Sequence, residues 1–229
     1  LPELERNFDV HCIDLPGFGF NNGVKLADYT LSALAEIIAP LCPQDSILAG
    51  WSLGGLIASN IALNYPKKVA SLCLIASSPC FVTQPDWQGI EPAVLQQFSQ
   101  DLTRDANKTI GRFLAIQSMG SESARKDAKL LKKAIFNRPS ADIEALIGGL
   151  KILENSDLRS VLNTLKMPIK GIYGQRDTLV AKTSIVKLAD SLANFEYLIL
   201  NKASHAPFIS HQQDFITSFE LLHLPLALI

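Results

Sequence analysis

The feature that most limits the possible folds is a regular alternation of short apolar runs with amphipathic segments. Runs typical of β-strands lie at residues 8–15, 46–51, 69–78, 168–174 and 195–200. Apolar residues at helical spacing fill the segments at 26–41, 53–66, 157–166, 183–193 and 212–224. This order builds a mainly parallel sheet covered by helices, so the sequence predicts an α/β fold.

One long segment interrupts the alternation. From residue 79 to residue 155 there is no convincing strand, and helical periodicity is found at 96–117, 122–136 and 141–153. We therefore expect a single α/β core made of residues 1–80 and 155–229, with a helical lid at residues 81–154 inserted into it.

Composition limits the functional classes. A chain of 229 residues with 48% hydrophobic residues can bury a large core, and its net charge of −1 gives no overall attraction to nucleic acid or to an anionic membrane. No apolar run approaches the roughly 20 residues that span a bilayer. The four cysteines form no C-x-x-C pair, so we expect buried, reduced thiols in a cytoplasmic monomer that holds no metal or cofactor.

The segment AGWSLGG, residues 49–55, places Ser52 where a predicted strand meets a predicted helix. A serine attacks a carbonyl carbon only if a base takes its proton and its oxygen stands clear of the backbone. Gly50 and Gly54 permit the sharp, strained turn that exposes such an oxygen, and the helix that follows directs its amides toward a developing oxyanion. This placement indicates a nucleophile.

The base and its orienting acid are sought at other strand ends. Of the four histidines, His205 follows the last predicted strand, while His11, His211 and His223 fit packing, helix-start or solvated positions. Asp177 follows the strand at 168–174 and lies between serine and histidine in chain order; Asp157 competes with it, but is well explained as a helix N-cap. The sequence therefore predicts a triad of Ser52, His205 and Asp177.

The motifs resemble those of α/β-hydrolases: DLPGFG (14–19), GWSLGG (50–55), YGQRD (173–177) and SHAPF (204–208). Within that superfamily, GWSLGGLIAS, IASSPCF, RFLAIQSMG, ARKDAKLLKK, GGLKIL and KASHAPFISH resemble the pimeloyl-[acyl-carrier protein] methyl ester esterases of biotin synthesis. These stretches lie in both the core and the lid, so they are more specific than the triad motifs alone.

The resemblance implies a serine esterase that removes the methyl group from a pimeloyl chain carried on acyl-carrier protein, with Leu53 N as one oxyanion donor. It also implies that the acyl chain is bordered by Trp51, Leu53, Phe113, Leu114, Ala115, Ile116 and Gln117. Family members carry a second oxyanion donor on an H-G loop before residue 8, and this chain contains no such motif. We therefore expect the natural protein to begin roughly 30 residues earlier, because a couple of strands and turns need that length.

Positive charge gathers in the lid. Residues 104–138 carry nine Lys or Arg and three acids, a net +6, so the rest of the chain carries −7. Helical spacing presents several of these cations together. A solvated surface would explain them, but the resemblance implies a docking site for the acidic carrier protein, and the residues expected to form it are Lys108, Arg112, Arg125 and Lys129.

Two other functions stay open at this point. A broad carboxylesterase would use the same triad without a carrier protein, and a non-catalytic binding protein would use only the fold. A dinucleotide site is disfavoured, because Asn22 takes the place of the third glycine that G-x-G-x-x-G requires.

Overall fold

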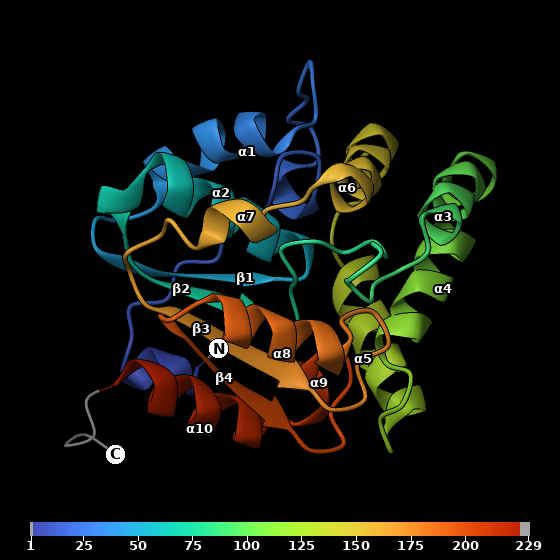
Figure 1. Cartoon of the computed structure of the whole chain (residues 1–229). Coiled ribbons are helices and arrows are strands. Elements are labelled where there is room, and N and C mark those ends of the chain that lie inside the picture. The colour runs from blue at the N-terminus through green and yellow to red at the C-terminus, as the bar shows by residue number, and fades with distance from the viewer. Residues whose placement is uncertain (1, 225–229) are drawn as a thin grey trace.

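The computed structural model describes residues 2–224. Within that range the centre is a parallel sheet of four strands in the order β1-β2-β3-β4 (Figure 1). The strands are β1 Ser46–Trp51, β2 Val69–Ile75, β3 Ile169–Gly174 and β4 Phe195–Leu200. Four predicted strands are thereby confirmed, and β2 ends earlier than predicted because Ala76 turns to a φ of 43°. Since all four run the same way, their carboxyl ends meet at one edge.

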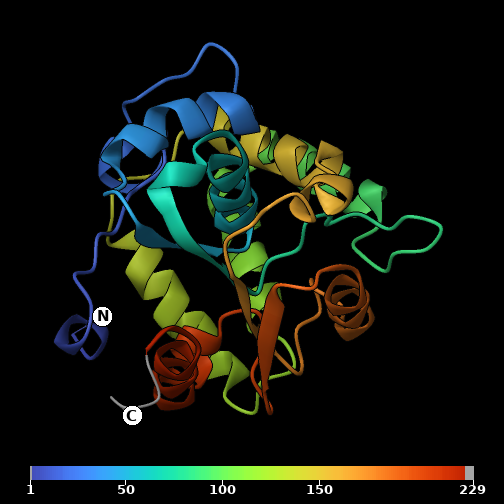
Figure 2. The ribbon, with the colours of Figure 1, turned by 60° about the vertical axis from the view of Figure 1, so that its left-hand side comes forward.

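Helices cover both faces of the sheet. Side chains alternate along β2, so that Leu72 and Leu74 join the larger core while Cys73 and Ile75 join a smaller one. The larger core includes α1 (Leu31–Ile38), α2 (Leu53–Asn64) and α8 (Lys182–Ser191). The smaller core is closed by α10 (Gln212–His223), which Figure 2 shows on the opposite side from α1 and α2.

Several helices differ in length from their predicted segments. The side chain of Thr30 accepts a hydrogen bond from Ala33 N and so begins α1 later than predicted. The segment at 157–166 forms only the short helix α7, Arg159–Leu162, and α9, Pro207–Ser210, was not predicted. Single 3₁₀ turns complete the chain: η1 Leu4–Arg6, η2 Gly19–Asn21, η3 Ala39–Leu41 and η4 Pro66–Lys68.

The strand predicted at residues 8–15 is wrong. Its apolar pattern fits a strand, but a strand also needs a hydrogen-bonded neighbour, and among residues 2–224 the backbone N–H groups of 9–14 donate to none. This extended segment leaves Cys12 exposed, so the prediction of a buried thiol is wrong there too. Cys42, Cys73 and Cys80 are buried and free.

The inserted segment packs beside the carboxyl edge of the sheet (Figure 1). It holds α3 (Pro92–Arg104), α4 (Ala106–Gln117), α5 (Ala124–Phe136) and α6 (Ile143–Asn155). The periodic stretch at 96–117 is divided at Asp105, whose carboxylate accepts a hydrogen bond from Lys108 N and begins α4. Among residues 2–224, no helix combines the length and apolarity that a membrane crossing requires.

Candidate active site

Ser52 lies in a strained turn between β1 and α2. Its φ of 53° and ψ of −119° are unfavourable for a residue with a side chain, and such strain persists only where neighbours hold it. Ser52 N donates to Ile75 O at 3.0 Å, and Ser52 O accepts from Ser77 Oγ at 2.7 Å and from Gly55 N at 3.0 Å. The end of β2 therefore fixes the turn that exposes the serine oxygen.

The glycines that this turn needs are not the pair expected. A Cβ atom on Gly50 would clash with the backbone of Gly54, and one on Gly55 would clash with the Ser77 side chain. A Cβ atom on Gly54 would meet nothing within 4 Å. Close packing of β1 against the start of α2 thus requires Gly50, and close packing of α2 against Ser77 requires Gly55, whereas Gly54 is not sterically required.

The three predicted residues form one hydrogen-bonded chain. His205 Nε2 lies 2.9 Å from Ser52 Oγ, and His205 Nδ1 lies 2.8 Å from Asp177 Oδ2. The side chains of His205 and Asp177 are completely buried, so water does not compete for their hydrogen bond. Asp177 follows β3 and His205 follows β4, and the parallel register brings both strand ends to the turn after β1. This arrangement can remove a proton from the serine as it attacks a carbonyl carbon.

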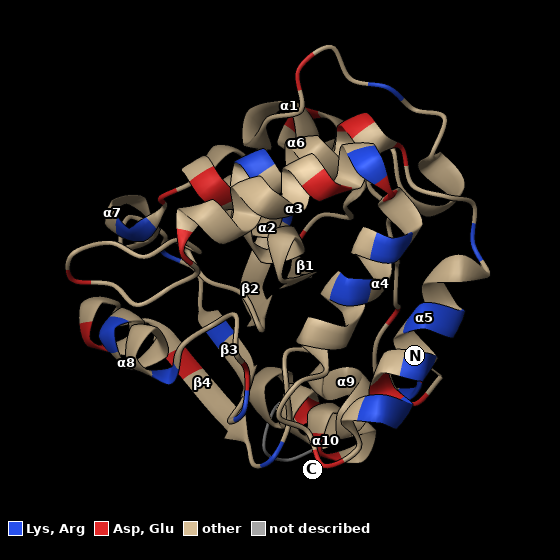
Figure 3. Cartoon of the chain, turned by 90° about the vertical axis from the view of Figure 1, so that its right-hand side faces the viewer, with Lys and Arg blue, Asp and Glu red and all other residues tan. Residues whose placement is uncertain are grey.

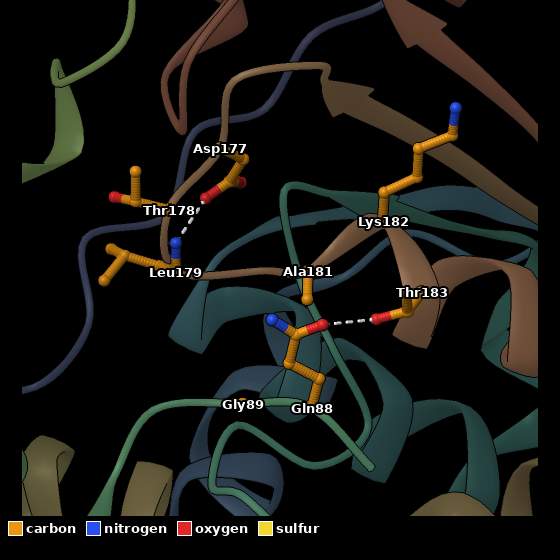
Figure 4. A pocket seen from close by; sticks show the side chains of 8 residues that line it. All are labelled: Gln88, Gly89, Asp177, Thr178, Leu179, Ala181, Lys182 and Thr183. Atoms are coloured by element: carbon orange, nitrogen blue, oxygen red, sulfur yellow. Dashed lines mark hydrogen bonds between the residues drawn. The ribbon is translucent and has the colours of Figure 1, made fainter.

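The Asp177 carboxylate is fixed on its other side by the backbone. Its Oδ1 accepts a hydrogen bond from Leu179 N at 2.8 Å, which Figure 4 shows, and a second one from Val180 N at 3.0 Å. A pocket of about 290 Å³ lies at this loop. Figure 4 shows the residues that line it, which come from the loop itself, from Gln88 and Gly89, and from the start of α8. Because the carboxylate is buried, the pocket does not expose it.

Tyr173, on β3, is a buried titratable group close to this carboxylate. Burial, then the charges of Cys73 and Asp177, raise the pKa of the Tyr173 phenol above its ordinary value.

The competing residues have other surroundings. Asp157 pairs with Arg159 at 2.7 Å and accepts a hydrogen bond from Arg159 N just before α7, although the N-cap of that helix is Leu158 and not Asp157 as predicted. His11 pairs with Asp9 on the surface, and His211 stands at the start of α10. His223 packs against Phe219. Among residues 2–224, no group of three or more His, Cys, Asp or Glu residues is placed to hold a metal ion.

Two contacts that the sequence did not indicate hold the loop that carries His205. We call this loop, residues 201–206, the histidine loop. Trp51 Nε1 donates to His205 O at 2.8 Å, and the Trp51 ring packs edge-on against Phe208 at 5.0 Å. His205 N donates to Gln117 O at 3.2 Å, which ties the loop to the end of α4. Trp51 was expected only to border the substrate, and no motif distinguishes an indole that also bonds a backbone carbonyl.

The predicted lid residues do not share one environment. Leu114 and Gln117, three positions apart on α4, are buried toward the histidine loop, and Leu114 clusters with Leu131 and Ala206. Phe113 packs against Phe98 on α3, Ile116 is half-buried and Ala115 is exposed. The other predicted residue, Leu53, follows Ser52 at the first position of α2, and its amide has no acceptor among residues 2–224.

The four predicted docking cations lie on α4 and α5, on the face that Figure 3 turns toward the viewer. All four are exposed: Lys108, Arg112, Arg125 and Lys129. Arg112 is already engaged, since its guanidinium pairs with Asp101 at 2.7 Å and lies 4.7 Å from the centre of the Phe98 ring. Arg125 and Lys129 form no ion pair with any other described residue.

Comparison with known proteins gives one consistent result. The sequence matches the family described as the alpha/beta hydrolase fold over residues 1–212. It is 50% identical over 215 residues to the pimeloyl-[acyl-carrier protein] methyl ester esterase of Pseudoalteromonas atlantica, covering 93% of this chain and 83% of that protein. The protein of the same name from Aeromonas hydrophila is 46% identical over 220 residues, with coverages of 96% and 87%.

Solved structures agree on the fold. An esterase from Exiguobacterium antarcticum superposes with a TM-score of 0.79 at 20% sequence identity, covering 90% of this chain and 78% of that one. At this identity the likeness concerns the arrangement of the sheet and helices alone.

Proposed function

The chain belongs to the pimeloyl-[acyl-carrier protein] methyl ester esterases, a family with the α/β-hydrolase fold, and we propose that Ser52, His205 and Asp177 perform its reaction. It is a carboxylic ester hydrolase that converts the methyl ester of pimeloyl-[acyl-carrier protein] to the free acid and methanol. The observation that carries the catalytic proposal is the hydrogen-bonded chain from Ser52 Oγ to the buried side chains of His205 and Asp177.

In the first half of the reaction, Ser52 Oγ attacks the ester carbonyl carbon while His205 Nε2 takes its proton. Asp177 keeps the Nδ1 proton of His205 in place and stabilises the imidazolium that forms. The imidazolium then gives its proton to the departing methoxide, which leaves as methanol, and the acyl group stays on Ser52. In the second half His205 activates water, which releases the acid and restores the serine.

Leu53 N is the proposed oxyanion donor within the described residues. It is the first amide of α2, it lacks an acceptor among residues 2–224, and the helix dipole favours negative charge there. For the acyl chain, we propose Trp51, Leu53 and α4 residues 113–117 as the border. Within that group Gln117 Oε1 is buried without a hydrogen-bond partner among the described residues, so only a bound hydrogen-bond donor, such as a water molecule, would satisfy this acceptor.

The carrier protein is proposed to dock on a cationic surface formed by Lys108, Arg112, Arg125 and Lys129. Their charges favour an acidic partner. Because Arg112 is neutralised by Asp101 while Arg125 and Lys129 have no acidic partner, the α5 pair should contribute more to docking than Arg112 does. On a surface that attracted the partner only by its general positive charge, Arg112 would contribute as much as Arg125 or Lys129.

Charge reversal tests this function. We expect Arg125→Glu with Lys129→Glu to raise KM for the carrier-bound methyl ester by about tenfold or more, because attraction becomes repulsion. Arg112→Glu alone should have a smaller effect. Hydrolysis of a short soluble ester should stay within about twofold of the unmodified protein, since that substrate needs no docking.

Lys67→Glu is the matched control, because Lys67 is also exposed but lies in η4, before the amino end of β2 and so at the opposite edge of the sheet. It should leave both substrates unaffected. Equal losses on both substrates in the α5 double variant, or an equal effect of Lys67→Glu, would contradict docking and favour the broad carboxylesterase.

We also propose that the protein acts as a cytoplasmic monomer, without nucleic acid or a membrane. The buried free thiols of Cys42, Cys73 and Cys80 support a reducing compartment. An oligomer in solution at working concentration would contradict the monomer.

A further inference from the structure

The turn between α4 and α5 contacts both loops that carry the buried triad residues. We call residues 118–123 the clamp turn. Immediately before it, Gln117 O accepts the hydrogen bond from His205 N at 3.2 Å. Within it, Gly120 O accepts from Arg176 Nη1 at 2.9 Å, and Arg176 directly precedes Asp177. A short stretch of the lid, residues 117–120, thus touches the histidine loop and the loop that carries Asp177. We call this second loop, residues 175–181, the aspartate loop.

Hydrogen bonds to Asp127 on α5 connect two serines of the clamp turn. The carboxylate of Asp127 is buried at 3% exposure and accepts hydrogen bonds from Ser121 Oγ at 2.7 Å and from Ser123 Oγ at 2.8 Å. Gly120 adopts a φ of +86°, and a Cβ atom there would come within 2.9 Å of the Arg176 side chain. The turn is therefore braced by α5 and approaches Arg176 closely.

Glu122 extends these contacts to the start of the histidine loop. Its Oε1 lies 2.9 Å from Lys202 Nζ and 4.0 Å from Arg176 Nη2, so a single carboxylate joins both loops. The loops are also joined to each other, since Arg176 N donates to Ala203 O at 2.8 Å. The hydrogen bond from Lys202, then its positive charge and, more weakly, that of Arg176, lower the pKa of Glu122.

We propose that Glu122 is a positioning residue for the esterase reaction: through Lys202 and Arg176 it holds the loops that set the distance from His205 to Ser52. This proposal rests on the proposed function of the triad. Glu122 touches none of the reacting atoms. Its loss would lower the fraction of molecules with His205 in hydrogen-bond reach, which slows the chemical step more than it weakens substrate binding.

The test uses a short, uncharged, soluble ester, so that carrier docking plays no part. Glu122→Gln is expected to lower kcat about two- to fivefold with KM nearly unchanged, the range that partly exposed ion pairs permit. Lys202→Met should lower kcat similarly, the double variant should lose no more than either single one, and Lys202→Arg should retain activity. Raising the salt concentration should lower kcat of the unmodified protein toward that of Glu122→Gln.

Glu196→Gln is the matched control. It removes an ion pair of the same 2.9 Å length, Lys170 to Glu196, which joins β3 to β4 away from their carboxyl ends. It should leave kcat and its salt dependence unchanged. The melting temperature of each variant shows whether a loss of activity merely follows unfolding.

The proposal is overturned if Glu122→Gln keeps full kcat, if its effect adds to that of Lys202→Met, or if Glu196→Gln acts equally. These outcomes leave the proposed function intact, because the unmodified protein still hydrolyses the ester. An unmodified protein that hydrolyses no ester would instead contradict the proposed function itself.

Discussion

At the scale of single residues, the site depends on one backbone conformation that most side chains avoid. Ser52 keeps a φ of 53° because Ile75 O and Ser77 Oγ hold its amide and carbonyl. That conformation lets α2 begin directly after β1 with the serine oxygen exposed. It also forces β1 and α2 so close together that glycine is required at Gly50.

Gly50 and Gly54 lie two residues before and two residues after Ser52. Replacing each with alanine shows which of them the packing requires and which belongs only to the sequence motif. Gly50→Ala should lower the free energy of unfolding by about 2 kcal/mol or more, because its Cβ would overlap the backbone of Gly54. Gly54→Ala should stay within about 1 kcal/mol of the unmodified protein, because its Cβ meets open space and alanine favours a helix. Urea unfolding measures both; equal destabilisation would contradict the packing found here.

The triad residues were predictable because each follows a strand, and parallel strands bring such positions to one edge. Asp177 was separable from Asp157 by the same reasoning, since Asp157 precedes a helix instead. The bond from Trp51 Nε1 to His205 O and the contact of Gln117 O with His205 N were not predictable. They join residues far apart in sequence, and in each of them the acceptor is a backbone carbonyl, which every residue type has.

At the scale of elements, apolar periodicity predicted where most helices and strands lie. It predicted less accurately the residues at which they begin and end. Side-chain caps set those ends: Thr30 begins α1, and Asp105 divides a single periodic stretch into α3 and α4. The error at residues 8–15 has another cause. Alternating apolar residues indicate that a segment favours extended backbone, whereas a strand also depends on a partner that the segment's own sequence does not specify.

The helix α10 makes stability depend on pH through His223. Burial, with a smaller effect of the charge on Lys170, lowers the pKa of His223 from 6.5 to about 4. Between those values the unfolded chain binds the additional proton, so the stabilisation is complete above about pH 6.5 and is lost as the pH falls toward 4.

The unmodified protein should have a lower free energy of unfolding at about pH 5 than at neutral pH. In His223→Leu this drop should be smaller by about 1–2 kcal/mol, a range that allows for partial solvent screening. Chemical unfolding at the two pH values provides the comparison. An unchanged difference between them would show that other groups cause the acid sensitivity.

At the scale of the whole molecule, we propose that the lid and the sheet edge act together. The core carries the proposed nucleophile, base and acid, while α4 and α5 carry the proposed docking surface and flank the clamp turn. The sequence located the inserted helices and their excess of positive charge. It did not indicate that Asp101 already neutralises Arg112, because the two residues lie on different helices whose packing is set by the fold.

The central claim is that Ser52 hydrolyses the methyl ester of carrier-bound pimeloyl chains. Mass spectrometry of intact pimeloyl methyl ester on acyl-carrier protein tests it most directly, with the unmodified protein and Ser52→Ala side by side. We expect the unmodified protein to replace the methyl group with hydrogen while the thioester to the carrier stays intact, and Ser52→Ala to be slower by on the order of 10⁶-fold. Equal conversion by both proteins, or a methyl ester left unchanged by the unmodified protein, would contradict the claim.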